Sequence, residues 1–243
     1  LKTDFVLKLE KVSLLLLFCI FISGCSAFKR TPKEEFIDDL YVQKKEGIKS
    51  KVYVDVDGED IRIHPVKKLN NVLIVDSLEA VQVYPLERKG TISENAKFRK
   101  NSFDIDFITI PLKLRPATKN VSTQLNATLN GAIFLGIRKD EYVVKYRSSP
   151  LNKSERQVTH LGYSVGLFTG FGNTDISSTN TNHHTEEEYD GVVWNKGVAF
   201  FFAVNRFTVG LALGFDNLMD HNKKIWIYEG KPWIGIGLGL NLN

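Results

Sequence analysis

Histidine and serine side chains are considered first, because a hydrolase needs an activated hydroxyl group close to a base. His160 and Ser164 are the pair of this kind that lies close together in a predicted strand. Four residues along a strand separate two side chains by about 13 Å, which is beyond hydrogen-bond reach. We therefore expect no catalytic residue here, and we predict that the protein is not an enzyme.

A metal site is the second kind of chemistry that the residue types could support. His183 and His184 precede three consecutive glutamates at residues 186–188, and these side chains suit a divalent transition metal. Adjacent imidazoles in a flexible loop rarely converge, and consecutive glutamates are typical of a solvated loop tip. The acidic residues 55–60 lack the spacing of an EF-hand loop and indicate a hairpin turn instead. We expect no metal and no cofactor.

Charged side chains recur on the polar face of the predicted strands. Lys113, Arg115 and Arg138 share that face, and Asp106 and Asp216 are expected to point the same way. Buried charges need partners, so one interpretation is an internal ion-pair network that plugs a narrow barrel. The alternative is a basic constriction that favours anions.

The elements that carry these residues have a strict period of two. From residue 161 onward, bulky apolar side chains alternate with glycine, alanine or polar ones. The pattern recurs in residues 125–138, 198–204, 209–216 and 234–242. A face of small residues cannot fill the wide core of a soluble sandwich, whereas a barrel in lipid turns its apolar face outward. We predict an all-β fold with an antiparallel up-and-down β-barrel of roughly eight strands.

The connections between these strands fit the same prediction. Asn205 and Arg206 form a tight turn, whereas residues 173–188 and 217–230 form long polar loops. Outer-membrane barrels combine short periplasmic turns with long external loops. Six aromatic residues near the strand ends suit either an interfacial girdle or a packed core: Tyr142, Tyr146, Trp194, Trp226, Tyr228 and Trp233.

The region before the barrel has a different pattern. Thr31 and Pro32 have the features of a helix start, so we predict a short amphipathic helix that presents Phe36, Ile37, Leu40 and Tyr41 on one face. Residues 50–85 alternate and contain the Asp57-Gly58 hairpin signal. Residues 86–102 are charged and poor in apolar residues, and they are predicted to be a linker or a long loop.

The first 25 residues carry a targeting signal. A lysine-containing flank precedes an apolar run at residues 12–22, which is too short to span a bilayer. The run ends in Ile22, Ser23, Gly24 and Cys25, which resembles the lipobox of bacterial lipoproteins. This resemblance implies that the chain is cut before Cys25 and that Cys25 carries a diacylglycerol. Ser26 favours the outer membrane over retention in the inner one.

Residues 103–116 and 124–138 resemble segments of uncharacterised small outer-membrane β-barrel proteins of Bacteroidota. The resemblance covers roughly residues 100–243 and implies no assigned chemistry. We expect residues 1–24 to be a signal peptide, 25–100 a lipid-anchored lead with a short helix and β-hairpins, and 101–243 the barrel domain.

Composition restricts the possible partners. The formal charge is +4 without a basic face, so nucleic acid is not an expected partner. Cys19 and Cys25 are the two cysteines, which excludes a disulfide framework in the body of the protein. The expected partner is membrane lipid, with an envelope protein or surface ligand open. We predict a non-enzymatic, lipid-anchored outer-membrane barrel with a structural, narrow-channel or surface-loop role. The alternative is a soluble, lipid-tethered β domain that binds a partner or a small apolar ligand.

The anchor prediction can be checked by metabolic labelling. A clickable fatty-acid analogue is expected to label the wild-type protein and not Cys25→Ser, because the thiolate sulfur is the site of acylation. Cys19→Ser is the matched control and should be labelled as the wild type is. Equal labelling of wild type and Cys25→Ser would contradict the prediction.

Overall fold

A computed structural model describes residues 35–45, 47–75, 82–89, 95–118, 121–150, 153–205 and 207–241. All of these residues belong to one compact unit, Lys33–Leu242. Cys25 and the targeting signal before it lie outside the described residues, as do Thr31 and Pro32 of the predicted helix start.

The described residues form one antiparallel sheet of 13 strands with two short 3-10 helices, and they contain no α-helix. The prediction of an all-β, antiparallel fold is therefore confirmed. The strands and 3-10 helices are β1 (Asp39–Lys45), β2 (Ile48–Asp57), β3 (Asp60–Leu69), β4 (Val72–Val75), β5 (Gln82–Tyr84), β6 (Glu87–Lys89), β7 (Asn95–Arg115), β8 (Gln124–Ala127), β9 (Asn130–Ser149), β10 (Lys153–Ile176), η2 (Thr179–Thr181), β11 (Tyr189–Val204), β12 (Phe207–Leu218), η3 (His221–Lys224) and β13 (Pro232–Asn241).

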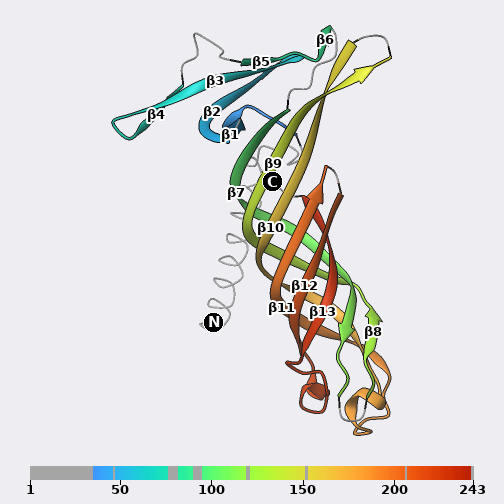
Figure 1. Cartoon of the computed structure of the whole chain (residues 1–243). Helices are drawn as coiled ribbons and strands as arrows, with labels where there is room; N and C mark the ends of the chain where they lie inside the picture. Colours follow the sequence, from blue (N-terminus) through green and yellow to red (C-terminus); the bar gives the residue numbers. More distant parts are fainter. Residues whose placement is uncertain are drawn as a thin grey trace, which may run out of the picture. The chain divides into compact units, whose positions relative to one another are not determined.

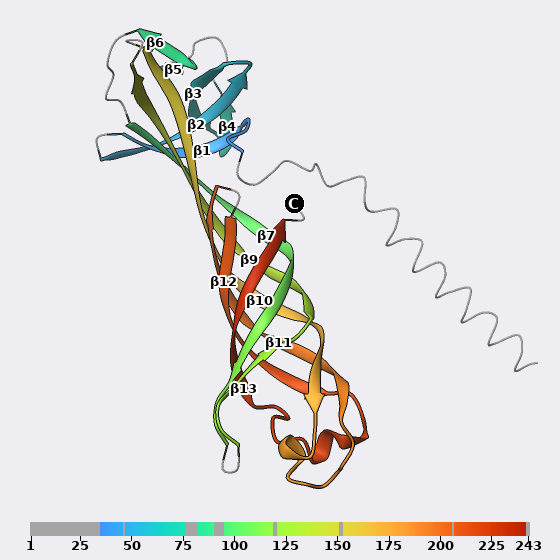
Figure 2. The ribbon, with the colours of Figure 1, turned by 90° about the vertical axis from the view of Figure 1, so that its right-hand side faces the viewer.

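Six of the strands close into a ring. Strands β7, β9, β10, β11, β12 and β13 follow one another as antiparallel neighbours, and β13 pairs again with β7. These strands wind side by side in Figure 1, and Figure 2 shows β13, in red, beside β7, in green. The closing pairs run from Ile234 opposite Leu114 to Asn241 opposite Asp106. The ring has six strands, whereas the sequence predicts roughly eight. Strands β7, β9 and β10 are 21, 20 and 24 residues long, so the same length of chain forms fewer strands.

Side chains on the ring alternate between its two faces as the sequence predicts. On the outer face, Leu213 and Leu238 have exposed fractions of 46% and 44%. On the inner face, Gly210, Gly214 and Asp216 are buried. Most bulky apolar side chains therefore point out of the ring, and the small and polar ones point into it, apart from one apolar cluster in its middle.

Glycine is required where neighbouring backbones meet most closely. A Cβ atom on Gly166 would lie 2.2 Å from the carbonyl oxygen of Leu135, and one on Gly170 would lie 2.1 Å from that of Gly131. Both contacts are with backbone, which cannot move aside without breaking the pairing of β9 with β10. These strands can therefore approach and bend as they do because their inward positions lack a side chain.

The middle of the ring is filled by apolar side chains. Phe134 and Phe201 pack edge to face with ring centroids 5.2 Å apart, and Phe168 lies 5.9 Å from Trp233. The cluster consists of Ile108, Ile110, Ala132, Phe134, Phe168, Ala199, Phe201, Ala212 and Trp233.

The N-terminal strands form a second packed region on extensions of the ring strands. Strand β1 pairs with β2 and with the N-terminal part of β7, at residues 97–99. Strand β2 pairs with β3 in the hairpin predicted at Asp57 and Gly58, where Gly58 has φ of +59°. The core of this region consists of Tyr41, Val52, Val54, Ile61, Ile63, Tyr84, Ala96, Phe98, Tyr142, Val144 and Tyr146.

Two predictions for the N-terminal region are wrong in the described residues. Residues 39–45 form strand β1 and not part of a helix, because β2 and β7 provide backbone partners on both of its edges. Phe36 still packs as an apolar residue, with its ring 5.0 Å from those of Tyr41 and Phe98. The predicted linker at residues 86–102 contains β6 and the start of β7, whose inward side chains Ala96 and Phe98 join the core.

The close approach of β9 and β10 can be tested at one glycine. We expect Gly166→Ala to lower the free energy of unfolding by about 1–3 kcal/mol, because the new methyl group collides with the backbone of β9. Gly131→Ala is the matched control: a Cβ there meets nothing within 4 Å, so the change should stay within about 0.5 kcal/mol. Denaturant unfolding followed by tryptophan fluorescence measures both. Equal effects at the two positions would show that the close backbone approach is not a constraint.

Candidate functional site

All five charged residues predicted to face the interior are buried: Asp106, Lys113, Arg115, Arg138 and Asp216. The structure brings Lys113, Arg115 and Asp216 together and places Arg138 in a separate cluster. Along β7, the apolar residues Ile108 and Ile110 lie between Lys113 and Asp104, which contacts Arg138, and this apolar layer explains the separation into two groups. Asp106 is buried between Asp104 and Ile108.

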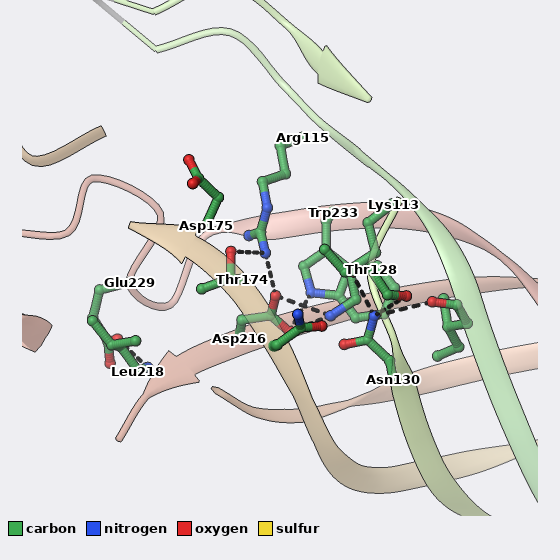
Figure 3. Close-up of polar contacts among 12 residues, drawn as sticks. Lys113, Arg115, Thr128, Asn130, Thr174, Asp175, Asp216, Leu218, Glu229 and Trp233 are labelled. Carbon is green, nitrogen blue, oxygen red and sulfur yellow. Dashed lines mark hydrogen bonds and ion pairs between the residues drawn. The ribbon is translucent and has the colours of Figure 1, made fainter. Parts of the chain in front are cut away.

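We call the first group the Asp216 cluster, which consists of Lys113, Arg115, Thr174, Asp216 and Trp233. Lys113 Nζ lies 3.0 and 3.1 Å from the two carboxylate oxygens of Asp216. Arg115 donates to the same carboxylate, and Trp233 Nε1 donates to it at 2.9 Å. Figure 3 shows these donors converging on Asp216, with Thr174 beside Arg115. One carboxylate on β12 therefore holds two cations from β7 and an indole from β13.

Aromatic rings cover the two cations of this cluster. Lys113 Nζ lies 4.4 Å from the centre of the Trp233 ring. The Arg115 guanidinium carbon lies 5.1 Å from the ring centres of both Trp226 and Tyr228. Rings at these distances stabilise a desolvated cation through their quadrupole.

The aromatic residues near the strand ends are predicted to form either an interfacial girdle or a packed core, and the structure places them in both exposed and buried positions. Trp194 has an exposed fraction of 40% on the outer face of the ring and so suits a girdle. The other five are buried in three different places. Tyr142 and Tyr146 belong to the core of the N-terminal region, Trp233 lies in the middle of the ring, and Trp226 and Tyr228 pack at the strand ends under the long connections.

The long connections join each other at one end of the ring. Residues 177–188 link β10 to β11, and residues 219–231 link β12 to β13. The amide of Ile227 in the second connection donates to the carbonyl of Asn180 in the first at 3.0 Å. Trp226 and Tyr228 from the second connection pack with Ile176, Val193 and Leu218 at the strand ends. The connections therefore form a packed cap that contributes side chains to the Asp216 cluster.

Burial affects the acidity of one hydroxyl group in this cap. Desolvation raises the pKa of Tyr228, against the opposing effect of the nearby Arg115 charge. The phenol therefore stays neutral at physiological pH and is available as a hydrogen-bond donor.

The second group, which we call the Arg138 cluster, consists of Asp104, Arg138, Asp140, His160 and Ser164. Arg138 Nε lies 2.8 Å from Asp140, and its Nη1 lies 3.9 Å from Asp104. His160 Nε2 lies 2.6 Å from the same Asp140 oxygen, whereas Ser164 donates to Asp104. His160 and Ser164 thus bond to different carboxylates and not to each other, which gives no activated serine in this geometry.

The sequence prediction of the interior charges missed Asp104, Asp140 and His160. Asp104 and Asp140 each lie two residues from a predicted member, Asp106 and Arg138, on the same face of their strands. Counting the alternation one step further along β7 and β9 would have found both. Trp226 and Tyr228 carry no such signal, because they lie in a connection and not in an alternating strand.

The two adjacent histidines are turned toward different partners. His183 Nδ1 lies 3.2 Å from the hydroxyl of Ser178, and His184 Nδ1 lies 2.8 Å from the carbonyl of Thr181. Across the part of the chain that the structure describes, no group of three or more His, Cys, Asp or Glu residues is arranged to hold a metal ion.

Comparison with known proteins gives no family: no family model, no curated protein and no solved structure matches the chain. Within the described residues, none of the helical segments has the length and apolar character needed to cross a membrane.

The Asp216 cluster makes a quantitative prediction. Asp216→Asn should lower the free energy of unfolding by about 3–5 kcal/mol, because it leaves Lys113 and Arg115 buried without a counter-charge. Asp175→Asn is the control, since Asp175 is exposed and the same substitution there should change stability by less than about 0.5 kcal/mol. Urea unfolding curves of the two variants give the comparison, and similar midpoints would exclude a structural role for Asp216.

Proposed function

We propose that this chain is a lipid-anchored, non-enzymatic outer-membrane β-barrel, in which the six-strand ring crosses the bilayer and the cap formed by the long connections is a surface platform. The observation that carries the proposal is the outer face of the ring, which bears large exposed apolar side chains on all six strands. We call this set the apolar belt: Phe103, Phe107, Leu114, Ile133, Leu135, Ile137, Tyr163, Val165, Leu167, Phe171, Val192, Trp194, Val198, Phe200, Phe207, Val209, Leu211, Leu213, Phe215, Ile234, Ile236 and Leu238.

The extent of the apolar belt supports a lipid environment. Water-soluble monomers rarely expose contiguous apolar patches above about 300–600 Å², and here the exposed apolar side chains encircle the ring. On β10 the outward apolar residues run from Tyr163 to Phe171. That run matches the roughly 9–11 residues that a tilted spanning strand needs.

The inner face supports a plugged barrel over a conducting one. Phe134, Phe168, Phe201 and Trp233 fill the middle of the ring, and charged clusters with mutual ion pairs lie on both sides of them. The ion-pair network of the first interpretation therefore describes the geometry better than a constriction open to anions.

The two ends of the ring differ as they do in outer-membrane barrels. Strand β11 ends at Val204 and β12 begins at Phe207, so little chain separates them, whereas the connections at residues 177–188 and 219–231 are long. Long connections face outward in such barrels, so the cap would face the outside of the cell. The N-terminal strands would then extend toward the periplasm, where an acyl chain on Cys25 would enter the inner leaflet.

A charged substitution in the apolar belt distinguishes a ring surrounded by lipid from a ring surrounded by water. Leu213 in β12 lies between Val198 and Ile234, both of which belong to the belt. In the bilayer, Leu213→Arg should cost about 2–4 kcal/mol and reduce the assembled fraction, whereas Leu213→Phe should be tolerated. The measurement is the fraction retained in outer membranes after alkaline extraction, in a Cys25→Ser background so that the anchor does not retain unassembled chain.

Ile48→Arg is the matched control for this experiment. Ile48 is also exposed and apolar, but it lies in β2 of the N-terminal region, outside the ring. A charge there should leave the assembled fraction unchanged. If Leu213→Arg and Ile48→Arg are equally harmless, and Cys25→Ser alone releases the protein into the soluble fraction, the tethered soluble domain replaces the barrel.

A further inference from the structure

A hollow of about 620 Å³ lies on the outer face of the ring, across strands β7, β9, β10 and β11. One of its walls is a row of the apolar belt, in which Phe103, Ile137, Val165 and Phe200 follow one another as register partners on neighbouring strands. All four side chains are exposed. A molecule beside the ring can therefore reach this wall directly.

The opposite wall of the hollow is polar. Asn101, Lys139 and Tyr163 form the next row of register partners across β7, β9 and β10, and all three are exposed. The Tyr163 ring packs against Phe202 on β11, with ring centres 5.4 Å apart. Successive outward residues of a strand are about 7 Å apart, so the hollow changes from apolar to polar over that distance along the strands. This change gives the hollow the amphipathic character of a lipid.

The charges at the polar wall favour an anion. Glu141 lies two residues from Lys139 on the same face of β9, but it is already paired with Arg99 at 2.6 Å and with Lys97 at 3.6 Å. Among the residues that the structure describes, no ion pair involves Lys139. A negatively charged group in the hollow would therefore pair with the Lys139 ammonium group without displacing an existing partner.

We propose that this hollow, which we call the belt hollow, binds an anionic phospholipid. An acyl chain lies along the row from Phe103 to Val165, and the phosphate group contacts the Lys139 ammonium group and the Tyr163 hydroxyl. Lysine and tyrosine suit the level of the lipid headgroups, because each joins an apolar stem or ring to a polar tip. The inference rests on the proposed function, since a bilayer phospholipid reaches the outer face only if the apolar belt lies in lipid.

Native mass spectrometry of the purified wild-type protein in a non-ionic detergent tests the belt hollow. The probes are phosphatidylglycerol and phosphatidylcholine with identical acyl chains. We expect about fivefold higher retention of phosphatidylglycerol, because a lysine beside an anionic headgroup contributes roughly that factor. Lys139→Gln should remove the preference, whereas Lys139→Arg should keep it. Lys145→Gln is the matched control: Lys145 is also exposed in β9 but lies outside the walls of the hollow, so the preference should persist.

A second pair of variants tests the apolar wall. Val165→Trp should lower the retention of both lipids, because the larger side chain fills the hollow, whereas Leu213→Trp places the same side chain on β12, outside the hollow, and should not.

The failure of this proposal differs from the failure of the proposed function. Equal retention of the two lipids by a membrane-retained wild type overturns the lipid site alone. Equal loss of the preference in Lys139→Gln and Lys145→Gln, or unchanged retention in Val165→Trp, has the same meaning. If Cys25→Ser alone releases the protein into the soluble fraction, both proposals are overturned.

Discussion

The pairing of β13 with β7 closes six strands into a ring, and the other features of the molecule depend on this closure. A ring of six strands has a narrow interior, so the inward positions must carry small side chains wherever neighbouring backbones meet. Gly166 and Gly170 show how strict the limit is, since even a methyl group at either position would overlap the backbone of β9. Apart from the central cluster around Phe134 and Trp233, the bulky apolar side chains then lie on the outer face, which is the reverse of the arrangement in a water-soluble sandwich.

The narrow interior of the ring also determines how its charged side chains are paired. Inward-pointing charges in such an interior are removed from water, and they remain there only because partners lie on neighbouring strands. Asp216 joins β12 to β7 through Lys113 and Arg115, and Asp140 joins β9 to β10 through His160. The apolar layer around Phe134 and Trp233 separates the two groups. Each charged cluster therefore links strands as well as neutralising its own members.

The cap at the end of the ring packs differently from the strands. Its aromatic residues come from a connection and not from the alternating strands, so they enter the interior from the end of the ring. Trp226 and Tyr228 cover Arg115 from that direction, and each ring centre lies 5.1 Å from the guanidinium carbon. The cap therefore closes one end of the ring and also covers the Arg115 cation with aromatic rings.

Much of this arrangement follows from the sequence alone. The period-two alternation determines which side chains of β10 to β13 point outward, and the Asp57-Gly58 signal places the β2–β3 hairpin. The same alternation places Lys113 and Arg115 together on one face, and Asp216 and Arg138 on the inner faces of their strands. Asp106 lies an odd number of residues before Lys113, and it shares the inner face because β7 is irregular between Thr109 and Leu112, where its register with β13 shifts. These properties are local, because a strand assigns its faces residue by residue and a tight turn needs few residues.

Only the tertiary structure decides which of these residues meet. The number of strands in the ring depends on the pairing of β13 with β7, two strands that lie more than a hundred residues apart in the chain. The pairing of β1 with β2 and β7 makes a strand of residues that have the spacing of a helix, because partners on both edges outweigh local preference. Asp216 acquires its two cations, and Arg115 its aromatic neighbours, through contacts between distant segments. The alternation in a sequence indicates the face of the sheet on which a side chain lies, but it does not indicate which side chain of a distant strand contacts it.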